Sequence, residues 1–185
     1  TAEAYGDAQP HWKETLERIA SNLVSKQNAD GSFNRAYRQD GKVVGPEDVS
    51  LYLVTRYSSP DCLRGESRIN TPVAVRFLVK MYEYTGENKY REAAVKAAEY
   101  SYNEIYLASA KFTGGTIDNP NTVDKEAAMY ALYAFNAANE LTGDKKYLDA
   151  AEYAAINAIS WVLTYDFKVP SSYNKLDSLL NHYVN

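Results

Sequence analysis

Apolar residues recur at three- and four-residue spacing along most of the chain, which is the pattern of amphipathic α-helices. The clearest stripe lies in the first helical segment and comprises Trp12, Leu16, Ile19, Ala20, Leu23 and Val24. The pattern predicts helices over residues 11–27, 47–57, 71–84, 89–106, 122–141 and 145–164, with 165–185 as a tail that could start another. We therefore expect one all-α domain over residues 1–185, with the helix at 47–57 the weakest.

Two of these segments carry the same cassette. Residues 85–100 read TGENKYREAAVKAAEY, residues 142–157 read TGDKKYLDAAEYAAIN, and eight of the sixteen aligned positions are identical. The offset between the two is 57 residues. Because each cassette joins one helix to the next through a short turn, the repeat predicts consecutive antiparallel hairpins at about 71–106 and 122–164. It also predicts equivalent buried positions for Tyr90 and Tyr147.

Local signals indicate where the hairpin helices begin and end. Thr71 is followed by proline, so it is expected to cap the helix that starts there. The pairs Thr85-Gly86 and Thr142-Gly143 predict helix ends, because glycine accepts the left-handed conformation. Asn88 is expected to cap the return helix of the first hairpin. Asn121 or Thr122 is expected to cap the next one, with Asp124 in its favourable first turn.

The connections between hairpins are long and polar, whereas the turns inside them are short. Loops that recur at one period lie on one face of a repeat protein, often its binding face. We therefore expect loops 28–46, 58–70 and 107–121 to share the face opposite the Thr-Gly turns. One parity problem remains: if 47–57 and 71–84 are both first helices of hairpins, a return helix between them is missing.

Composition excludes several classes of protein. The net charge is −4, so no global basic field attracts nucleic acid or an anionic membrane surface. No apolar run approaches the roughly 18 residues of a membrane span. The lone Cys62 forms no internal disulfide, and with His11 and His182 it lacks metal-ligand spacing. No nucleotide-binding motif occurs, so no cofactor is expected. The one outlier is tyrosine, at 17 residues, which suits half-wet grooves or helix ends.

Two features carry a family resemblance. The hairpin pattern of a helix, Thr-Gly-Asp and then Lys-Tyr-Leu-x-Ala-Ala resembles the (α/α)-toroid carbohydrate enzymes called six-hairpin glycosidases. The turn at 27–33, Gln-Asn-Ala-Asp-Gly-Ser-Phe, is similar to a turn that recurs in such toroids. The resemblance covers most of residues 11–165. It implies a partial toroid of about three hairpins, half of a full one, in a longer polysaccharide-degrading protein.

The first candidate site is an acidic cluster around the start of the helix at 122. Asp118, Asp124 and Glu126 are candidate catalytic carboxylates and Asn119 a substrate contact, because glycoside hydrolysis needs two carboxyl groups across one bond. Asp124 and Glu126 cannot act from one helix face, since residues two apart diverge. The competing interpretation is structural: Asp124 belongs to the helix cap and Asp118 to a turn. A Ca²⁺ site is a third interpretation.

The second candidate site follows the first helix. Asp30, Phe33, Arg35, Tyr37 and Arg38 combine aromatic rings, which stack on sugars, with arginines, which pair with uronate carboxylates. In the competing interpretation, Asp30 forms a turn, Phe33 plugs the end of the hairpin and the arginines are solvated. A third, charge-rich loop around Cys62 is more typical of a solvated loop.

Two functions follow from these features. The first is a carbohydrate-processing domain, part of a glycoside hydrolase or polysaccharide lyase, whose partner is an oligosaccharide or polysaccharide. The second is a non-catalytic helical module that binds a glycan or a protein. No signal peptide opens the chain, so the sequence assigns no location; a secreted or periplasmic parent protein, whose other domains would be further partners, is compatible with it.

Overall fold

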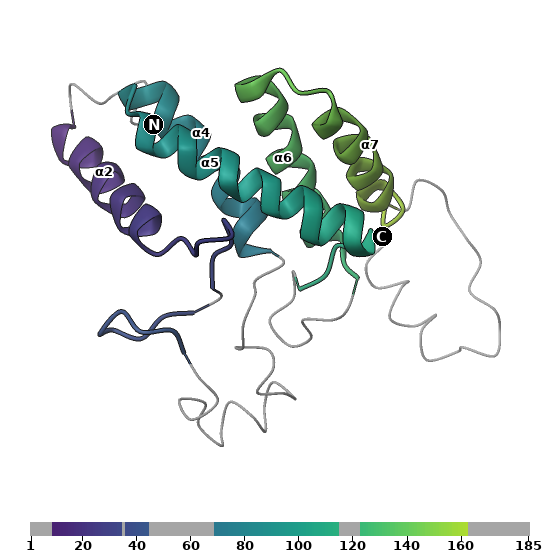
Figure 1. The fold of residues 1–185 in the computed structure, drawn as a ribbon, viewed down its shortest axis with the longest axis horizontal. Helices are drawn as coiled ribbons and strands as arrows, with labels where there is room; N and C mark the ends of the chain where they lie inside the picture. Colours follow the sequence, from purple (N-terminus) through teal and green to yellow (C-terminus); the bar gives the residue numbers. More distant parts are fainter. Residues whose placement is uncertain (1–8, 35, 45–68, 115–122, 163–185) are drawn as a thin grey trace, which may run out of the picture.

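The computed structural model describes residues 9–34, 36–44, 69–114 and 123–162. Within these residues it contains helices and isolated bridges but no strand (Figure 1). The helices are α2 (Pro10–Ser25), α4 (Asn70–Thr85), α5 (Asn88–Tyr100), the π-helical segment η3 (Ser101–Leu107), α6 (Lys125–Thr142) and α7 (Lys146–Ile159). The all-α class is confirmed. The helix expected at 47–57 and the tail at 165–185 lie outside the described residues.

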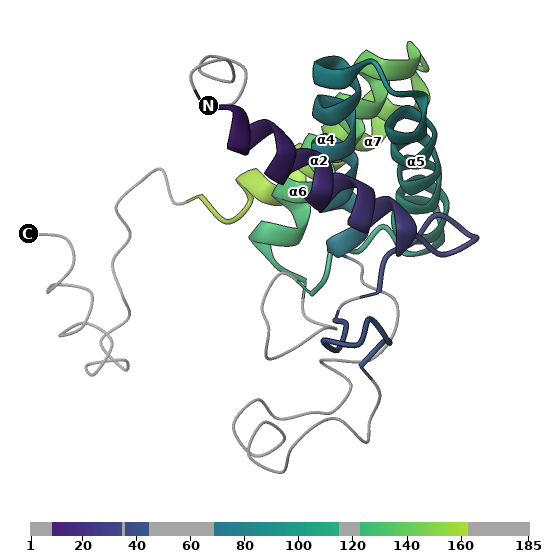
Figure 2. The same cartoon turned by 90° about the vertical axis from the view of Figure 1, so that its left-hand side faces the viewer.

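The helices pair as the repeat predicts. α4 packs against α5 and α6 packs against α7, which gives two antiparallel hairpins, and α4 and α6 also pack against one another (Figure 1). We call α4 and α6 the central helices and α5 and α7 the return helices. α2 lies against α4 and α5, on the side away from α7 (Figures 1 and 2).

Alanine allows the helices to approach closely. The return helix α5 buries Ala93, Ala94, Ala97 and Ala98, and α6 buries Ala127, Ala128, Ala131, Ala134, Ala137 and Ala138. Because these side chains are small, the helix axes can come close together, and larger apolar residues fill the remaining space beside the alanines. Phe135, Leu78 and Val75 do so, each of them fully buried.

The two Thr-Gly turns have the same geometry. Gly86 and Gly143 adopt φ angles of 73° and 72°, and each donates its N–H to the carbonyl four residues earlier at 2.7 Å. The hydroxyls of Thr85 and Thr142 each donate to the carbonyl four residues earlier at 2.7 Å. The left-handed glycines end α4 and α6 as predicted, and the repeat in the sequence is a repeat in the structure.

The helix starts differ from the predicted caps. Thr71 lies inside α4, fully buried, and its Oγ1 accepts the backbone N–H of Phe33 at 3.0 Å. Asn88 likewise lies inside α5 and makes no side-chain cap. Asp124 itself is the N-cap of α6: its Oδ1 accepts the N–H of Ala127 at 2.8 Å. The reason is tertiary, because the Thr71 hydroxyl binds the loop after α2 instead of capping its own helix.

The described parts of the long loops lie at the end predicted for them. The segment after α2 reaches the N-terminus of α4, where the Asn70 side chain donates to the Asn34 carbonyl at 3.2 Å. The segment after η3 reaches the N-terminus of α6, where the Asp124 N–H donates to the Phe112 carbonyl at 3.1 Å. Both N-termini lie at the end of the hairpins opposite the α4–α5 and α6–α7 turns (Figure 1). Loop residues 45–68 and 115–122 lie outside the described part of the chain.

Candidate functional site

The solvent-facing sides of the two central helices form one surface rich in tyrosine. It consists of Val73, Arg76 and Lys80 on α4 and Glu126, Tyr130 and Tyr133 on α6, and we call it the tyrosine face. Tyr130 and Tyr133 are 40% and 38% exposed. The Arg76 guanidinium lies over the Tyr133 ring, with its Cζ 4.9 Å from the ring centroid. This contact joins the exposed stripes of the two helices into one surface.

Helical periodicity explains why these side chains point outward. The alanines of α6 take the positions that pack against α4 and α7, which leaves Glu126, Tyr130 and Tyr133 at relative positions 0, 4 and 7. Residues at that spacing lie on one side of a helix. Large aromatic side chains on an alanine-rich helix are therefore held outward by the close packing of the opposite side.

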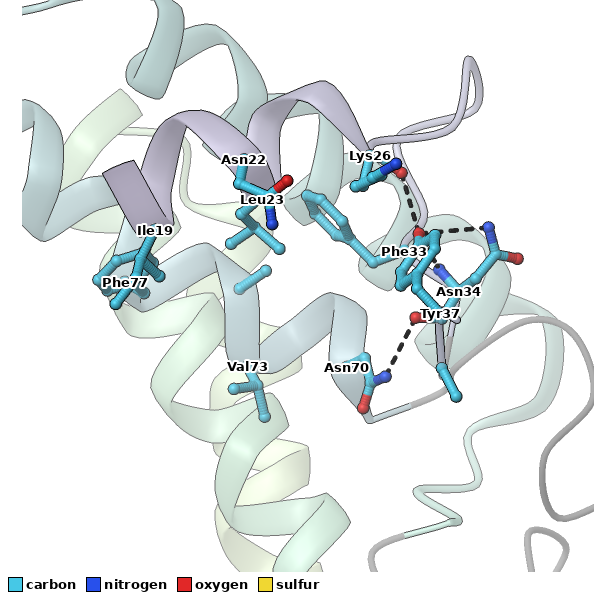
Figure 3. Close-up of a pocket in the computed structure, with 12 residues that line it drawn as sticks. Ile19, Asn22, Leu23, Lys26, Phe33, Asn34, Tyr37, Asn70, Val73 and Phe77 are labelled. Carbon is cyan, nitrogen blue, oxygen red and sulfur yellow. Dashed lines mark hydrogen bonds between the residues drawn. The ribbon is translucent and has the colours of Figure 1, made fainter. Parts of the chain in front are cut away.

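A groove of about 590 Å³ adjoins this surface between α2 and α4 (Figure 3). Val73, which belongs to the tyrosine face, also lines the groove. The apolar lining comprises Ile19, Leu23, Phe33, Ala36, Val73, Ala74 and Phe77, and the polar lining comprises Asn22, Lys26, Asn34, Tyr37 and Asn70. A volume of this size is typical of small-ligand sites. The described residues of the lining include three amides and one cation, and none of them is a carboxylate.

Hydrogen bonds hold the loop end of the groove. The Tyr37 hydroxyl donates to the Lys26 carbonyl at 3.1 Å, and the Lys26 ammonium donates to the Gly41 carbonyl at 2.9 Å. That ammonium also lies 5.7 Å from the Tyr37 ring centroid. The Asn34 side chain donates to Asn28 Oδ1 at 3.2 Å. Asn22 is an exposed residue on α2 that points toward the groove (Figure 3). The groove thus has a fixed loop wall and one exposed amide.

The residues of the second predicted site lie in different surroundings. Phe33 is only 2% exposed, so its ring offers little surface for stacking on a sugar, and its burial favours the structural interpretation. Asp30 Oδ1 accepts the Ser32 N–H at 2.9 Å and the Ser32 hydroxyl at 2.7 Å, which is a turn. Arg38 approaches Asp40 at 3.6 Å. Tyr37 lines the groove, and Arg35 lies outside the described residues.

The first predicted site is described only in part. Asp124 is 7% exposed and engaged as a helix cap, whereas Glu126 is exposed on the tyrosine face. Asp118 and Asn119 lie outside the described residues, so their roles stay predictions. Among the described residues, no group of histidine, cysteine and carboxylate side chains is arranged to hold a metal ion. The charge-rich loop around Cys62 also lies outside the described part.

A titratable cluster joins the return helices. Glu99 Oε1 accepts the Lys146 ammonium at 2.6 Å and the Tyr147 hydroxyl at 2.7 Å. Partial burial raises the pKa of Glu99, but the two hydrogen bonds outweigh it and hold that pKa below its ordinary value. The hydrogen bond to Glu99 raises the pKa of Lys146. Burial, followed by the hydrogen bond to Glu99, raises the pKa of Tyr147. The cluster links α5 to α7 at a partly exposed position, and its chemistry is that of a structural ion pair.

Sequence reasoning missed Arg76, Tyr130 and Tyr133. The signal was present in the stretch Glu-Ala-Ala-Met-Tyr-Ala-Leu-Tyr at 126–133, where one carboxylate and two tyrosines share a helix face. The partner Arg76 lies 50 residues or more earlier in the chain, and only the packing of α4 against α6 brings it there.

Comparisons with protein-family models, with curated proteins and with solved structures find no match to this chain. Among the described helices, none is long and apolar enough to cross a membrane. The functional argument therefore depends on the surface chemistry of the tyrosine face and the groove.

Proposed function

We propose that this chain is the glycan-binding part of a carbohydrate-processing protein built from hairpins of the (α/α)-toroid type. One observation carries the proposal: two exposed tyrosines and a stacked arginine share the tyrosine face, which adjoins a groove of ligand size. An exposed tyrosine ring presents a flat apolar surface and a polar tip. Those are the two features that a pyranose, with its apolar ring faces and equatorial hydroxyls, requires of a binding surface.

The groove supplies complementary hydrogen-bonding groups. Asn22, Asn34 and Asn70 offer amide donors and acceptors, and the apolar lining between them matches the C–H faces of sugar rings. A glycan that crosses α4 near Val73 would contact the groove and the tyrosine face together. Arg76 has guanidinium edges that are suited to hydroxyl or carboxylate oxygens.

The proposal also assigns two candidate catalytic carboxylates. Hydrolysis of a glycosidic bond uses two carboxyl groups. Of the predicted acids, Glu126 is the one that the structure exposes beside the tyrosines, and Asp118 is proposed as its partner. Asp124 is assigned to the helix cap. The alternative function, a non-catalytic module that binds glycan, uses the same surface and does not require Asp118.

Binding is tested first, by a glycan array followed by calorimetry on the best glycan. Tyr130→Ala and Tyr133→Ala are each expected to weaken binding about 5-fold, because an aromatic stacking contact contributes about 1 kcal/mol. Tyr153→Ala is the control, since Tyr153 is 36% exposed but lies on α7. Absence of glycan binding by the wild-type chain at millimolar concentration, repeated with the full-length parent protein, would refute the proposal.

Turnover is tested separately, on neutral and acidic polysaccharides. Glu126→Gln and Asp118→Asn are expected to abolish hydrolysis or elimination while glycan affinity stays within about two-fold. If wild-type protein binds glycan but releases no product, the non-catalytic function is the correct one. If Glu126→Gln leaves turnover unchanged, the catalytic role of Glu126 is wrong.

A further inference from the structure

Each return helix carries, in its first turn, a tyrosine whose hydroxyl binds a side chain of an earlier helix. Tyr90, the third residue of α5, places its hydroxyl 3.2 Å from Ser21 Oγ on α2. Tyr147, the second residue of α7, places its hydroxyl 2.7 Å from Glu99 on α5. Both tyrosines are fully buried, at 0% and 1% exposure. The chain therefore uses the same contact twice, from α5 to α2 and from α7 to α5.

The spacing within the helices extends this pattern to α2. Glu99, the hydrogen-bond partner of Tyr147, follows Tyr90 by nine residues on α5. Ser21, the hydrogen-bond partner of Tyr90, follows Trp12 by nine residues on α2, and Trp12 is the third residue of that helix. α2 is therefore a helix of the return type, with Trp12 in the place of Tyr90 and Tyr147. His11 precedes Trp12 as lysine precedes each of the two tyrosines.

The two ends of this series are both exposed and both apolar. Trp12 is 40% exposed, although the equivalent tyrosines are buried. At the other end, nine residues after Tyr147, the equivalent position is Ile156, which is 60% exposed. Around it, the exposed side of α7 and its end carry Leu148, Ile159, Trp161 and Val162. Among the described residues, one end thus has an exposed aromatic residue, and the other end has an exposed apolar surface.

We propose that the exposed face of α7 binds the first turn of α2 in a second copy of this chain, so that copies associate head to tail. Trp12 of one copy would occupy on Ile156 the place that Tyr147 occupies on Glu99. Glu99 is a hydrogen-bond acceptor and pairs with a tyrosine hydroxyl. Ile156, at the equivalent position of α7, is apolar and is suited to a tryptophan ring. The contact would repeat, between two copies, the placement of a first-turn aromatic residue that the chain uses in the hydrogen bonds of Tyr90 and Tyr147.

This contact is heterologous, since it joins two different surfaces of the same chain. Such contacts form rings when the rotation closes and open chains when it does not. Trp12 and Ile156 belong neither to the lining of the groove nor to the tyrosine face. Assembly and glycan binding can therefore be changed by separate substitutions.

Sedimentation velocity and light scattering on the full chain, from about 1 μM to about 500 μM, test the proposal across the affinities of weak interfaces. The weight-average mass is expected to rise at least two-fold above the 20.8 kDa of one chain. Trp12→Asp and Ile156→Asp should each hold the protein at monomer mass. Leu107→Asp, at a residue that is 59% exposed on η3, is the matched control and should associate as the wild type does.

A mixing experiment tests the head-to-tail geometry. Each single variant keeps one intact end, so an equimolar mixture of Trp12→Asp and Ile156→Asp is expected to form a discrete 1:1 dimer that stops at twice the monomer mass. A face-to-face dimer through α7 would instead persist in Trp12→Asp, and that result would overturn the proposal. A wild-type chain that stays monomeric throughout would overturn it too. Circular dichroism verifies that each variant is folded, and Trp12→Ala and Ile159→Asp replace any variant that is not.

Discussion

The hydroxyl of Tyr147 donates a 2.7 Å hydrogen bond to the carboxylate of Glu99, 48 residues earlier in the chain. The bond joins the two return helices, and it shares its acceptor with the ammonium of Lys146. Glu99 lies on the return helix of the first hairpin, and Lys146 and Tyr147 lie on that of the second, so these three side chains link the two hairpins. They also make the stability of that contact depend on pH.

Glu99→Ala is expected to lower the free energy of unfolding by about 1 kcal/mol at pH 7. Hydrogen bonds to charged groups contribute about 1.5–3 kcal/mol, and the 41% exposure of Glu99 reduces this. A group whose folded pKa is lowered contributes stability above its ordinary pKa, here 4.5, and loses it as pH falls through the folded value. The difference between wild type and variant, measured by urea denaturation from pH 7 to pH 3, should therefore shrink below about pH 4.5. A difference that is constant over that range would contradict the assigned ion pair.

Tyr147→Phe tests the same cluster at the alkaline end. The pKa of Tyr147 is raised, so the folded tyrosine stays protonated after the unfolded one ionises above its ordinary value of 10.0. A raised group contributes stability below the unfolded pKa and loses it as pH rises. We expect the phenylalanine variant to be less stable by about 1 kcal/mol at pH 8. The gap should narrow in thermal unfolding above pH 10, and Tyr82→Phe serves as a control outside the cluster.

Alanine substitutions at the left-handed glycines are expected to lower stability by different amounts. At Gly86 and Gly143 an added Cβ would meet no atom within 4 Å, so Gly86→Ala and Gly143→Ala should cost only the backbone strain, about 1–2 kcal/mol each. At Gly31, where φ is 94°, a Cβ would overlap the Lys96 backbone carbonyl. Gly31→Ala should therefore cost distinctly more than either turn. Equal losses in chemical denaturation would show that Gly31 and Lys96 are not in contact.

Asp124 is expected to act as a helix cap. Asp124→Ala should lower the unfolding free energy by about 1 kcal/mol, whereas Asp124→Asn should change it little, because asparagine caps as well as aspartate. Glycan affinity should be the same in both variants. Loss of glycan binding by Asp124→Asn with an unchanged melting temperature would restore the functional interpretation of this residue.

Phe33→Ala is expected to destabilise the chain by about 3–5 kcal/mol, the range for removing a buried phenylalanine. The ring is buried, and its backbone N–H is bound by Thr71, so the loss should appear in unfolding experiments. Phe33→Leu, which keeps most of the apolar volume, should lose less than half as much. A variant that is fully stable but binds glycan weakly would indicate that the ring is accessible after all.

The sequence alone determined the helices, their hairpins and the turns between them. These features depend on local chemistry: the spacing of alanines and tyrosines, and glycines such as Gly86 and Gly143 that end helices by adopting a backbone conformation other residues resist. The 57-residue repeat also predicted equivalent buried positions for Tyr90 and Tyr147, and both side chains are buried.

Only the tertiary structure decided what the individual polar and aromatic side chains do. Phe33, in the loop after α2, and Tyr133, on α6, are both aromatic residues, yet Phe33 is buried whereas Tyr133 contacts Arg76 at the surface. Thr71 precedes a proline as a cap should, but its hydroxyl is used by the backbone of Phe33, 38 residues away. Burial and hydrogen-bond partners are set by segments far apart in the chain, and the periodicity of one segment carries no information about which other segment will cover it.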